Sequence, residues 1–226
     1  MFCITIAENT IEQVIKKLKK AEKYSDFFEI RIDYLEKVEK EFLIKLCQNS
    51  RKFIFTFRAP QEGGKKEIAD VEKLSLILWL LDHCSALIDV EFFFFKKYYQ
   101  IFLEKKEKFN NLLISYHNFE ETPSDRKLKG ILKKMQELCV KNAKVVTFCR
   151  KKEDWLRLLM LVAYARELGI SLVAFGMGEE GKLSRILCLF FGSPFTYVVL
   201  DKKEAVAPGQ FDIKTAKKIY QILKEF

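Results

Sequence analysis

The chain is poor in several residue types, and each shortage removes a class of protein. Histidine occurs only twice and proline only four times in 226 residues. Two histidines, without any CxxC pair, cannot complete a usual zinc pattern, so no metal site is expected. Hydrophobic residues make up 49% of the chain, which does not indicate disorder and predicts a sizeable core.

Long apolar segments are also missing. The longest runs, such as residues 76–81, are too short to span a bilayer. The N-terminus, MFCITIAENT, has neither the basic segment nor the apolar stretch of a signal peptide. We therefore expect a cytoplasmic protein with no membrane partner. The six cysteines are scattered in apolar company, which predicts buried free thiols in a reducing compartment.

Positive charge is in excess, with a formal net charge of +9. The lysines fall mainly in helical stretches, as in residues 16–20 and 105–108, which predicts a solvated, lysine-rich outer surface. No stripe of arginine interleaved with aromatic residues is present, so no nucleic-acid partner is expected. The excess charge would instead attract a small anionic substrate.

Short apolar segments alternate with longer amphipathic ones along the whole chain. Apolar or alternating runs predict strands near 2–7, 27–33, 53–58, 86–91, 111–116, 144–149, 170–175 and 195–200. Spacing of 3.6 residues predicts helices near 11–22, 38–48, 66–83, 93–107, 126–139, 152–168, 182–190 and 213–225. Eight alternating repeats without a linker predict a single-domain α/β protein, a (β/α)8 TIM barrel over residues 1–226.

Barrels of this kind place their active sites at the carboxyl ends of the strands. In the second predicted strand, Glu29, Arg31 and Asp33 alternate with isoleucines, so all three should point into the barrel. A self-satisfied structural network is as good an interpretation of Asp33 as a functional one. The third strand ends at Arg58, a natural anchor for an anion, and Glu62 follows in the next loop.

Two acidic residues and a histidine come next along the chain. Asp89 and Glu91 share one face of the fourth strand, where they would either orient a neighbouring base or pair with Arg31. His117 ends the fifth strand, and a neutral imidazole there could take and return a proton. The alternative for His117 is a histidine satisfied by hydrogen bonds in the core.

Lys144 opens the sixth predicted strand. A lysine on an interior face is costly unless it is used, and a free amine attacks ketones to form an imine. The alternative is a lysine that extends along the start of the strand to reach solvent. Further along, the glycine-rich turn 176–181 does not fit a nucleotide fingerprint. Gln210 lies in the last loop, which is placed to cover the barrel mouth as a lid.

The motifs together resemble type I 3-dehydroquinate dehydratase, the imine-forming dehydratase of the shikimate pathway. The resemblance rests on SYHNFEETP at 115–123 and MGEEGKLSR at 177–185, with Glu29-Ile30-Arg31, Thr56-Phe57-Arg58, Glu62-Gly63-Gly64, Lys144 and Ala207-Pro208-Gly209-Gln210 in the family's order. It implies a hydro-lyase that needs no metal or cofactor, commonly a homodimer, acting on 3-dehydroquinate. In some members this domain is fused to a shikimate dehydrogenase domain, so a longer parent chain is an open alternative.

The resemblance also implies roles for single residues. Lys144 would form the imine, His117 would shuttle protons, and Glu62 would assist His117. Arg185 would bind the substrate carboxylate. Four further residues would hold hydroxyl groups and close the site: Glu29, Arg31, Arg58 and Gln210.

The sequence departs from the family pattern at Phe175, Tyr197 and Val206, which bears on pocket shape more than on chemistry. Two other functions remain as alternatives. One is another imine-forming barrel, such as a class I aldolase acting on phosphorylated sugars. The other is a degenerate barrel that serves as a basic binding module.

Overall fold

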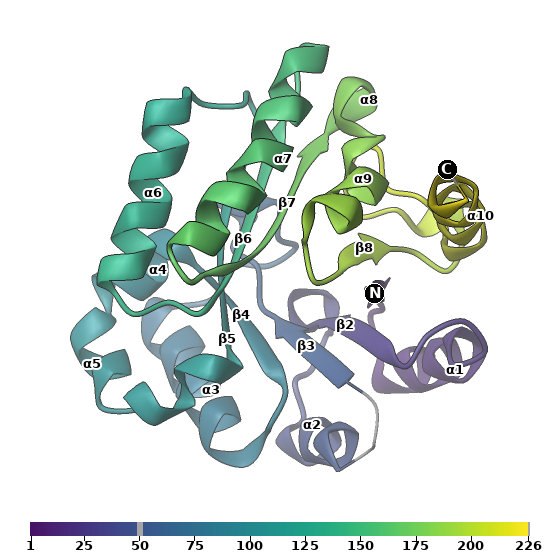
Figure 1. Cartoon of the computed structure of the whole chain (residues 1–226). Coiled ribbons are helices and arrows are strands. Elements are labelled where there is room, and N and C mark those ends of the chain that lie inside the picture. The colour runs from purple at the N-terminus through teal and green to yellow at the C-terminus, as the bar shows by residue number, and fades with distance from the viewer. Residues whose placement is uncertain (49–51, 226) are drawn as a thin grey trace.

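The computed structural model describes residues 1–48 and 52–225, and parallel strands alternate with helices throughout (Figure 1). The strands are β1 (Phe2–Ile6), β2 (Phe27–Arg31), β3 (Lys52–Thr56), β4 (Leu87–Glu91), β5 (Leu112–Asn118), β6 (Asn142–Phe148), β7 (Ser171–Met177) and β8 (Thr196–Val198). The α-helices are α1 (Ile11–Ala21), α2 (Lys40–Cys47), α3 (Asp70–His83), α4 (Phe92–Lys97), α5 (Tyr99–Leu103), α6 (Asp125–Glu137), α7 (Lys152–Glu167), α8 (Gly178–Gly181), α9 (Ser184–Phe191) and α10 (Ile213–Lys224). Short 3₁₀ turns are η1 (Ile32–Tyr34), η2 (Pro60–Glu62), η3 (Lys106–Asn111) and η4 (Lys202–Glu204).

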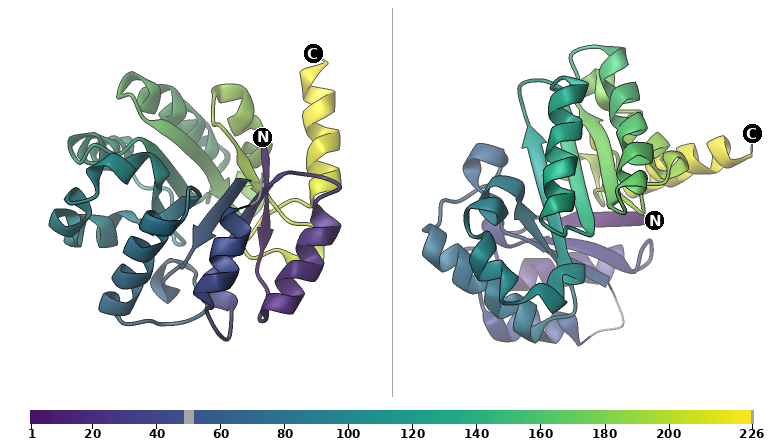
Figure 2. Two further views of the ribbon diagram at one scale, coloured as in Figure 1. Left: turned by 90° about the horizontal axis from the view of Figure 1, so that it is seen from below. Right: turned by 60° about the vertical axis from the view of Figure 1, so that its left-hand side comes forward.

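The strands form one sheet in the order β7-β6-β5-β4-β3-β2-β1-β8, and it curls into a nearly closed barrel. The predicted (β/α)8 fold is confirmed. Near the seam between β7 and β8, the backbone N–H of Ala174 donates to the hydroxyl of Ser193, 3.4 Å away. The helices surround the strands, and α10 lies beside α1 near the start of the chain (Figure 2). The predicted domain 1–226 includes four residues, 49–51 and 226, outside the described part.

Strand burial on both faces explains why these segments read as apolar runs. All five residues of β2 are buried. Residues such as Phe28 and Ile30 pack outward against the helices in the larger apolar cluster. Others, including Phe27, Val173 and Phe195, fill the barrel interior in a second cluster. Parallel strands covered on both sides show this near-continuous hydrophobicity.

The helices turn apolar stripes inward and lysines outward. Helix α1 begins with a capping box, in which Thr10 and Gln13 satisfy each other's backbone N–H groups. It buries Val14, Leu18 and Ala21 and leaves the lysines at 16, 19 and 20 exposed. The prediction of a lysine-rich outer surface is confirmed for this helix.

Two local predictions are wrong. The helix predicted over 93–107 is broken into α4, α5 and η3, because the backbone leaves the helical region at Tyr98 (φ −106°, ψ 21°). The second strand ends at Arg31, so Asp33 lies in the turn η1 instead of continuing the alternation. At this turn, the Arg31 guanidinium donates two hydrogen bonds to the Asp33 carboxylate, at 2.9 and 2.7 Å.

The prediction that all cysteines are free is also wrong. Cys47 and Cys84 form a disulfide that joins the carboxyl ends of α2 and α3, with their Cα atoms 5.5 Å apart. They are 37 residues apart in sequence, so only the packing of two helices brings them within disulfide distance. Cys3, Cys149 and Cys188 are buried free thiols, as predicted, and Cys139 is partly buried.

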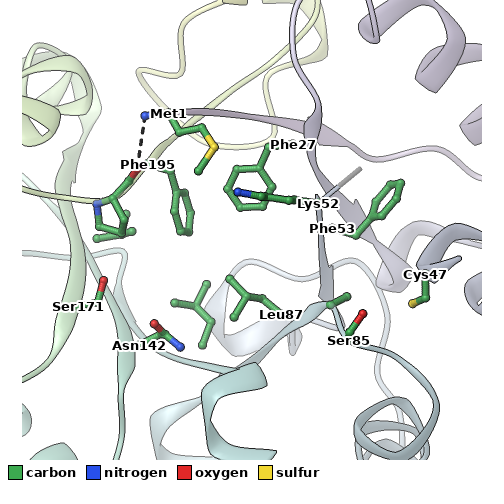
Figure 3. Close-up of a pocket in the computed structure, with 14 residues that line it drawn as sticks. Met1, Phe27, Cys47, Lys52, Phe53, Ser85, Leu87, Asn142, Ser171 and Phe195 are labelled. Carbon is green, nitrogen blue, oxygen red and sulfur yellow. Dashed lines mark hydrogen bonds between the residues drawn. The ribbon is translucent and has the colours of Figure 1, made fainter. Parts of the chain in front are cut away.

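A cavity with a volume of about 530 Å³ lies at the amino-terminal ends of the strands (Figure 3). Apolar side chains such as Phe27, Leu87 and Phe195 face it. None of the described residues that line it belongs to the set predicted for chemistry. In the described part of the chain, no helix has the length and apolar character to cross a membrane.

Candidate active site

The residues predicted to catalyse the reaction or bind the substrate meet at the opposite end of the barrel. Eight of them line one cavity: Glu29, Arg31, Arg58, Glu62, His117, Lys144, Arg185 and Gln210. Alternate positions of β2, β5 and β6 point Glu29, Arg31, His117 and Lys144 inward, and the other four residues come from segments that follow strand ends. The cavity is narrow, with a volume of only about 60 Å³.

Lys144 is the third residue of β6, and its side chain is held inside the barrel. Its Nζ donates to Asp89 Oδ2 at 3.0 Å, and its side chain is only 8% exposed. The alternative of a lysine reaching solvent is therefore wrong. The other Asp89 oxygen, Oδ1, accepts from the hydroxyl of Ser115 and lies 2.6 Å from Arg58 Nη2. Burial alone would raise the pKa of Asp89, but Arg58 and Lys144 hold this pKa well below its usual range. Asp89 is thus an ionised anchor for the amine.

His117 and Glu62 form a hydrogen-bonded pair beside the amine. His117 Nδ1 lies 2.9 Å from Glu62 Oε2. Burial lowers the pKa of His117 well below 6.5, and the positive charges of Arg58 and Lys144 add to this effect. The imidazole is therefore neutral near pH 7. An ionised Glu62 can only accept a hydrogen bond, so Nδ1 carries the proton and Nε2 is left as the basic nitrogen.

Glu62 is itself unusual. Burial raises its pKa to about 7, although the nearby Arg58 opposes the shift. Its position depends on a tight turn: Gly63 has a left-handed backbone (φ +84°), and a Cβ on Gly64 would lie 1.8 Å from the carbonyl oxygen of Arg58. Only glycine fits there, because the chain folds back on itself. The pair Gly63-Gly64 thus places Glu62 over the barrel.

Glu29 and Arg31 are held by protein partners. The Glu29 carboxylate accepts from the hydroxyls of Thr5 and Thr56, at 2.9 and 2.8 Å. Arg31 is occupied by Asp33, whose carboxylate also accepts from the backbone N–H of Lys65. The contacts of Asp33 support the structural interpretation of this residue.

The predicted alternative pairing of Asp89 and Glu91 with Arg31 is wrong. Asp89 pairs with Arg58 and Lys144, as described above. Glu91 instead binds the buried Lys73 of α3, at 2.6 Å, and lies 3.6 Å from Arg58.

Arg185 supplies a buried positive charge with no acidic partner among residues 1–48 and 52–225. It is the second residue of α9, is 2% exposed, and lies over the ring of Phe175 at 4.5 Å. Its Nε has no hydrogen-bond partner, and its Nη2 donates to the carbonyl of Pro208. Burial lowers its pKa to about 10, which Cys188 and Cys149 partly offset. Such a group favours an anion in the cavity.

The loop after η4 closes the site. Val206, Ala207 and Gln210 line the cavity. The Gln210 side chain accepts from the backbone N–H of Val206, at 3.2 Å, and donates to Thr5 at 3.4 Å. These bonds connect the last loop to the first strand, so the loop is in position to act as a lid.

Sequence reasoning missed several supporting residues. Thr5 and Thr56 orient Glu29, Ser115 bridges Arg58 and Asp89, and Lys73 neutralises Glu91. The threonines lie at inward positions of predicted strands, which is a usable signal. Lys73 is one lysine among many helical ones, and nothing in the sequence marks it as buried.

Metal binding has no support from the described residues. Across 1–48 and 52–225, no cluster of three or more histidine, cysteine, aspartate or glutamate side chains is suited to a metal ion. The polar groups of the cavity are instead a lysine, an imidazole, carboxylates and arginines. That set suits imine and proton-transfer chemistry on a small anion.

Comparison with known proteins agrees with this chemistry. A family model described as type I 3-dehydroquinase matches residues 2–226. A 3-dehydroquinate dehydratase from Methanococcus maripaludis is 34% identical over 229 residues, which cover 99% of this chain and 100% of the relative.

Two solved structures show the same fold. The type I 3-dehydroquinate dehydratase from Clostridium difficile, solved with covalent modified comenic acid, superposes with a TM-score of 0.87 at 26% identity, covering 99% of this chain and 92% of that one. The dehydroquinate dehydratase and shikimate dehydrogenase of S. pombe has a TM-score of 0.82 at 22% identity, covering 100% of this chain and 45% of that longer one. The chain belongs to the type I 3-dehydroquinase family.

Proposed function

We propose that this enzyme converts 3-dehydroquinate to 3-dehydroshikimate through an imine on Lys144, as a step of the shikimate pathway toward chorismate and the aromatic amino acids. One observation carries the proposal. A buried lysine anchored on Asp89 and a neutral histidine anchored on Glu62 share one narrow cavity. The covalently modified ligand in the Clostridium difficile relative and the names of the relatives support it.

The first step forms the imine. The amine of Lys144 adds to the C3 ketone, and loss of water leaves an iminium on the lysine nitrogen. The positive charge stays beside Asp89, whose ionised carboxylate lies 3.0 Å from Nζ. Because the same carboxylate pairs with the ammonium before the step and with the iminium after it, the site does not have to reorganise around a new charge.

The second step is the elimination. The iminium withdraws electrons from C2, so the neutral Nε2 of His117 can remove the proton there. The resulting enamine expels the C1 hydroxyl, which takes a proton from the imidazolium and leaves as water. Glu62 stabilises that imidazolium through the bond to Nδ1. Hydrolysis of the imine then releases the product and regenerates Lys144.

Substrate binding uses the remaining polar groups. Arg185 binds the carboxylate, because it is a buried cation without an acidic partner in the described part of the chain. Hydroxyl groups of the substrate are held by Glu29, Arg31, Arg58 and Gln210, which line the cavity. A volume of about 60 Å³ is far below the roughly 300 Å³ of small-molecule pockets, so the loop with Val206 and Gln210 opens for entry.

The chemistry uses side chains alone and needs no cofactor. We propose a homodimer, because Leu156 and Met160 on α7 are apolar and 48% and 64% exposed. The cytoplasmic location predicted from the sequence stays a prediction. The S. pombe relative shows that such a domain occurs together with a shikimate dehydrogenase in a longer chain.

Borohydride trapping tests the proposal. We expect 3-dehydroquinate with borohydride to leave a substrate-derived mass on the peptide that contains Lys144, because reduction fixes the imine as an amine. Lys144→Ala should give no adduct and almost no turnover. His117→Ala should still give the adduct slowly but lose about 100-fold or more in turnover.

A parallel incubation separates the alternatives. An aldolase would be trapped by phosphorylated sugars rather than by 3-dehydroquinate. A folded wild-type protein without any adduct would contradict the proposal and favour the binding module. That module would bind nucleic acid in a salt-dependent way.

A further inference from the structure

Tyr197 on β8 carries a buried hydroxyl that the proposed mechanism does not use. The residue is 4% exposed, and its Oη has no hydrogen-bond partner within residues 1–48 and 52–225. Its ring packs edge-on against Phe175 and Phe195, at 6.3 and 5.4 Å between centroids. Phenylalanine would fill the same space without burying an unsatisfied polar group, which is costly. Packing therefore does not explain the hydroxyl.

The ring of Tyr197 is in contact with the amine. Lys144 Nζ lies 4.3 Å from the ring centroid, and Asp89 Oδ2 lies 3.0 Å from the same nitrogen. The amine thus rests between a carboxylate and an aromatic face, and both interactions favour the ammonium. Tyr197 also lines the narrow cavity together with Lys144. Its hydroxyl is carried on the ring that contacts Lys144.

The surrounding carboxylates do not take this hydroxyl. Glu29 accepts from two threonines, and Asp89 accepts from Ser115 and Lys144. Burial raises the pKa of Tyr197 well above 10, and the negative charges of Glu29 and Asp89 add to the shift. The hydroxyl therefore keeps its proton and remains a hydrogen-bond donor. A molecule that enters the cavity can supply its acceptor.

We propose that Tyr197 is a further catalytic residue in imine formation: its ring orients Lys144 Nζ, and its hydroxyl donates a hydrogen bond to the ketone oxygen that Lys144 attacks. This inference rests on the proposed function. One proton of the Lys144 ammonium first passes to the neutral Nε2 of His117, which frees the nitrogen electron pair. The nitrogen then forms the C–N bond while the carbonyl π pair moves to the oxygen, and the C–O bond breaks when the nitrogen pair forms C=N. Two protons of the ammonium, one of them returned by His117, leave with that oxygen as water, and one stays on the iminium, so charge and atoms balance. Tyr197 keeps its own proton and stabilises the oxygen while negative charge develops on it.

Tyr197→Phe separates the hydroxyl from the ring. We expect the rate of borohydride-trapped adduct on Lys144, measured by rapid quenching with 3-dehydroquinate, to fall about 5- to 10-fold. The Michaelis constant should stay within about twofold, because the bond strengthens during attack. The unliganded variant should melt about 2–4 °C higher, since an unsatisfied buried group is gone. A purely structural hydroxyl would not slow trapping while raising the melting temperature.

Two further variants complete the test. Tyr116→Phe is the matched control. Tyr116 is also 4% exposed, but it belongs to the larger apolar cluster that packs outward against the helices. It should change neither the trapping rate nor the Michaelis constant. Tyr197→Leu removes ring and hydroxyl together and should slow trapping further than Tyr197→Phe.

The outcomes distinguish this inference from the proposed function. An adduct that forms equally fast in Tyr197→Phe and wild type would overturn the role of Tyr197 and leave the dehydratase intact. A lower melting temperature in Tyr197→Phe would show that the hydroxyl already has a partner, which also overturns it. No adduct in the wild type would instead remove the imine mechanism itself.

Discussion

At the scale of single residues, Glu62 and His117 behave as one unit. They share a hydrogen bond, and their pKa values are shifted in opposite directions. Burial raises the pKa of Glu62 to about 7 and lowers the pKa of His117 well below 6.5. Above pH 7 the pair therefore holds an ionised carboxylate and a neutral base, the arrangement needed for proton removal. As the pH falls through 7, Glu62 takes up a proton first and stops accepting from Nδ1.

The pH profile of kcat/KM tests this order. We expect activity to fall on the acid side near pH 7, as an apparent value for the pair, rather than at the lower pH where His117 would protonate. The Gln side chain cannot ionise, so the kcat/KM of Glu62→Gln should no longer fall near pH 7. At pH 8 its activity should be about tenfold lower than that of the wild type. Rates measured from pH 5 to 9 for both proteins check this. A limb near pH 7 that persists in Glu62→Gln would assign it to another group.

At the scale of elements, the loop between β8 and α10 decides access to the site. Gly209 has a left-handed backbone (φ +78°), and a Cβ there would lie 2.8 Å from the carbonyl oxygen of Gly178. The neighbouring Pro208 carbonyl accepts from Arg185, and Gln210 reaches Thr5. A displaced backbone at Gly209 would therefore loosen the closed position of the lid.

We expect Gly209→Ala to raise the Michaelis constant about 5- to 10-fold, because both the backbone strain and the contact with Gly178 oppose closure. Steady-state kinetics and hydrogen exchange of residues 205–210 provide the measurement. Gly130→Ala is the control, since Gly130 lies within α6 and a Cβ there meets nothing within 4 Å. It should stabilise the helix by about 0.5–1 kcal/mol and leave the Michaelis constant unchanged. Equal Michaelis constants for Gly209→Ala and wild type would argue against a lid.

At the scale of the whole molecule, the exposed apolar residues of α7 bear on assembly. Leu156 and Met160 lie one helical turn apart, so they share a face of the helix. If this face is the proposed homodimer interface, Met160→Glu should place a charge in an apolar contact and weaken the dimer about 100-fold or more. Sedimentation equilibrium of the variant checks the mass. Val71→Glu on α3, where Val71 is 76% exposed, should not change it. A wild-type monomer would contradict the dimer.

Much of the site could be predicted because it follows from strand alternation. Glu29, His117 and Lys144 lie on inward positions of β2, β5 and β6, and a barrel brings such positions together whatever the loops do. The partners of Asp89 could not be predicted, because Arg58, Ser115 and Lys144 come from three different strands or their ends. Long-range pairing of this kind depends on barrel geometry and not on local pattern.

The sequence alone determined the class of fold and the chemical inventory of the site, because hydrophobic period and residue type are local properties that survive in any arrangement of the chain. Tertiary structure alone decided the Cys47–Cys84 bond, the anchoring of Lys144 on Asp89 and the unpartnered hydroxyl of Tyr197. Each of these depends on distances between segments far apart in sequence. Burial then sets the pKa of Glu62 and His117, since desolvation exists only once the barrel has closed around them.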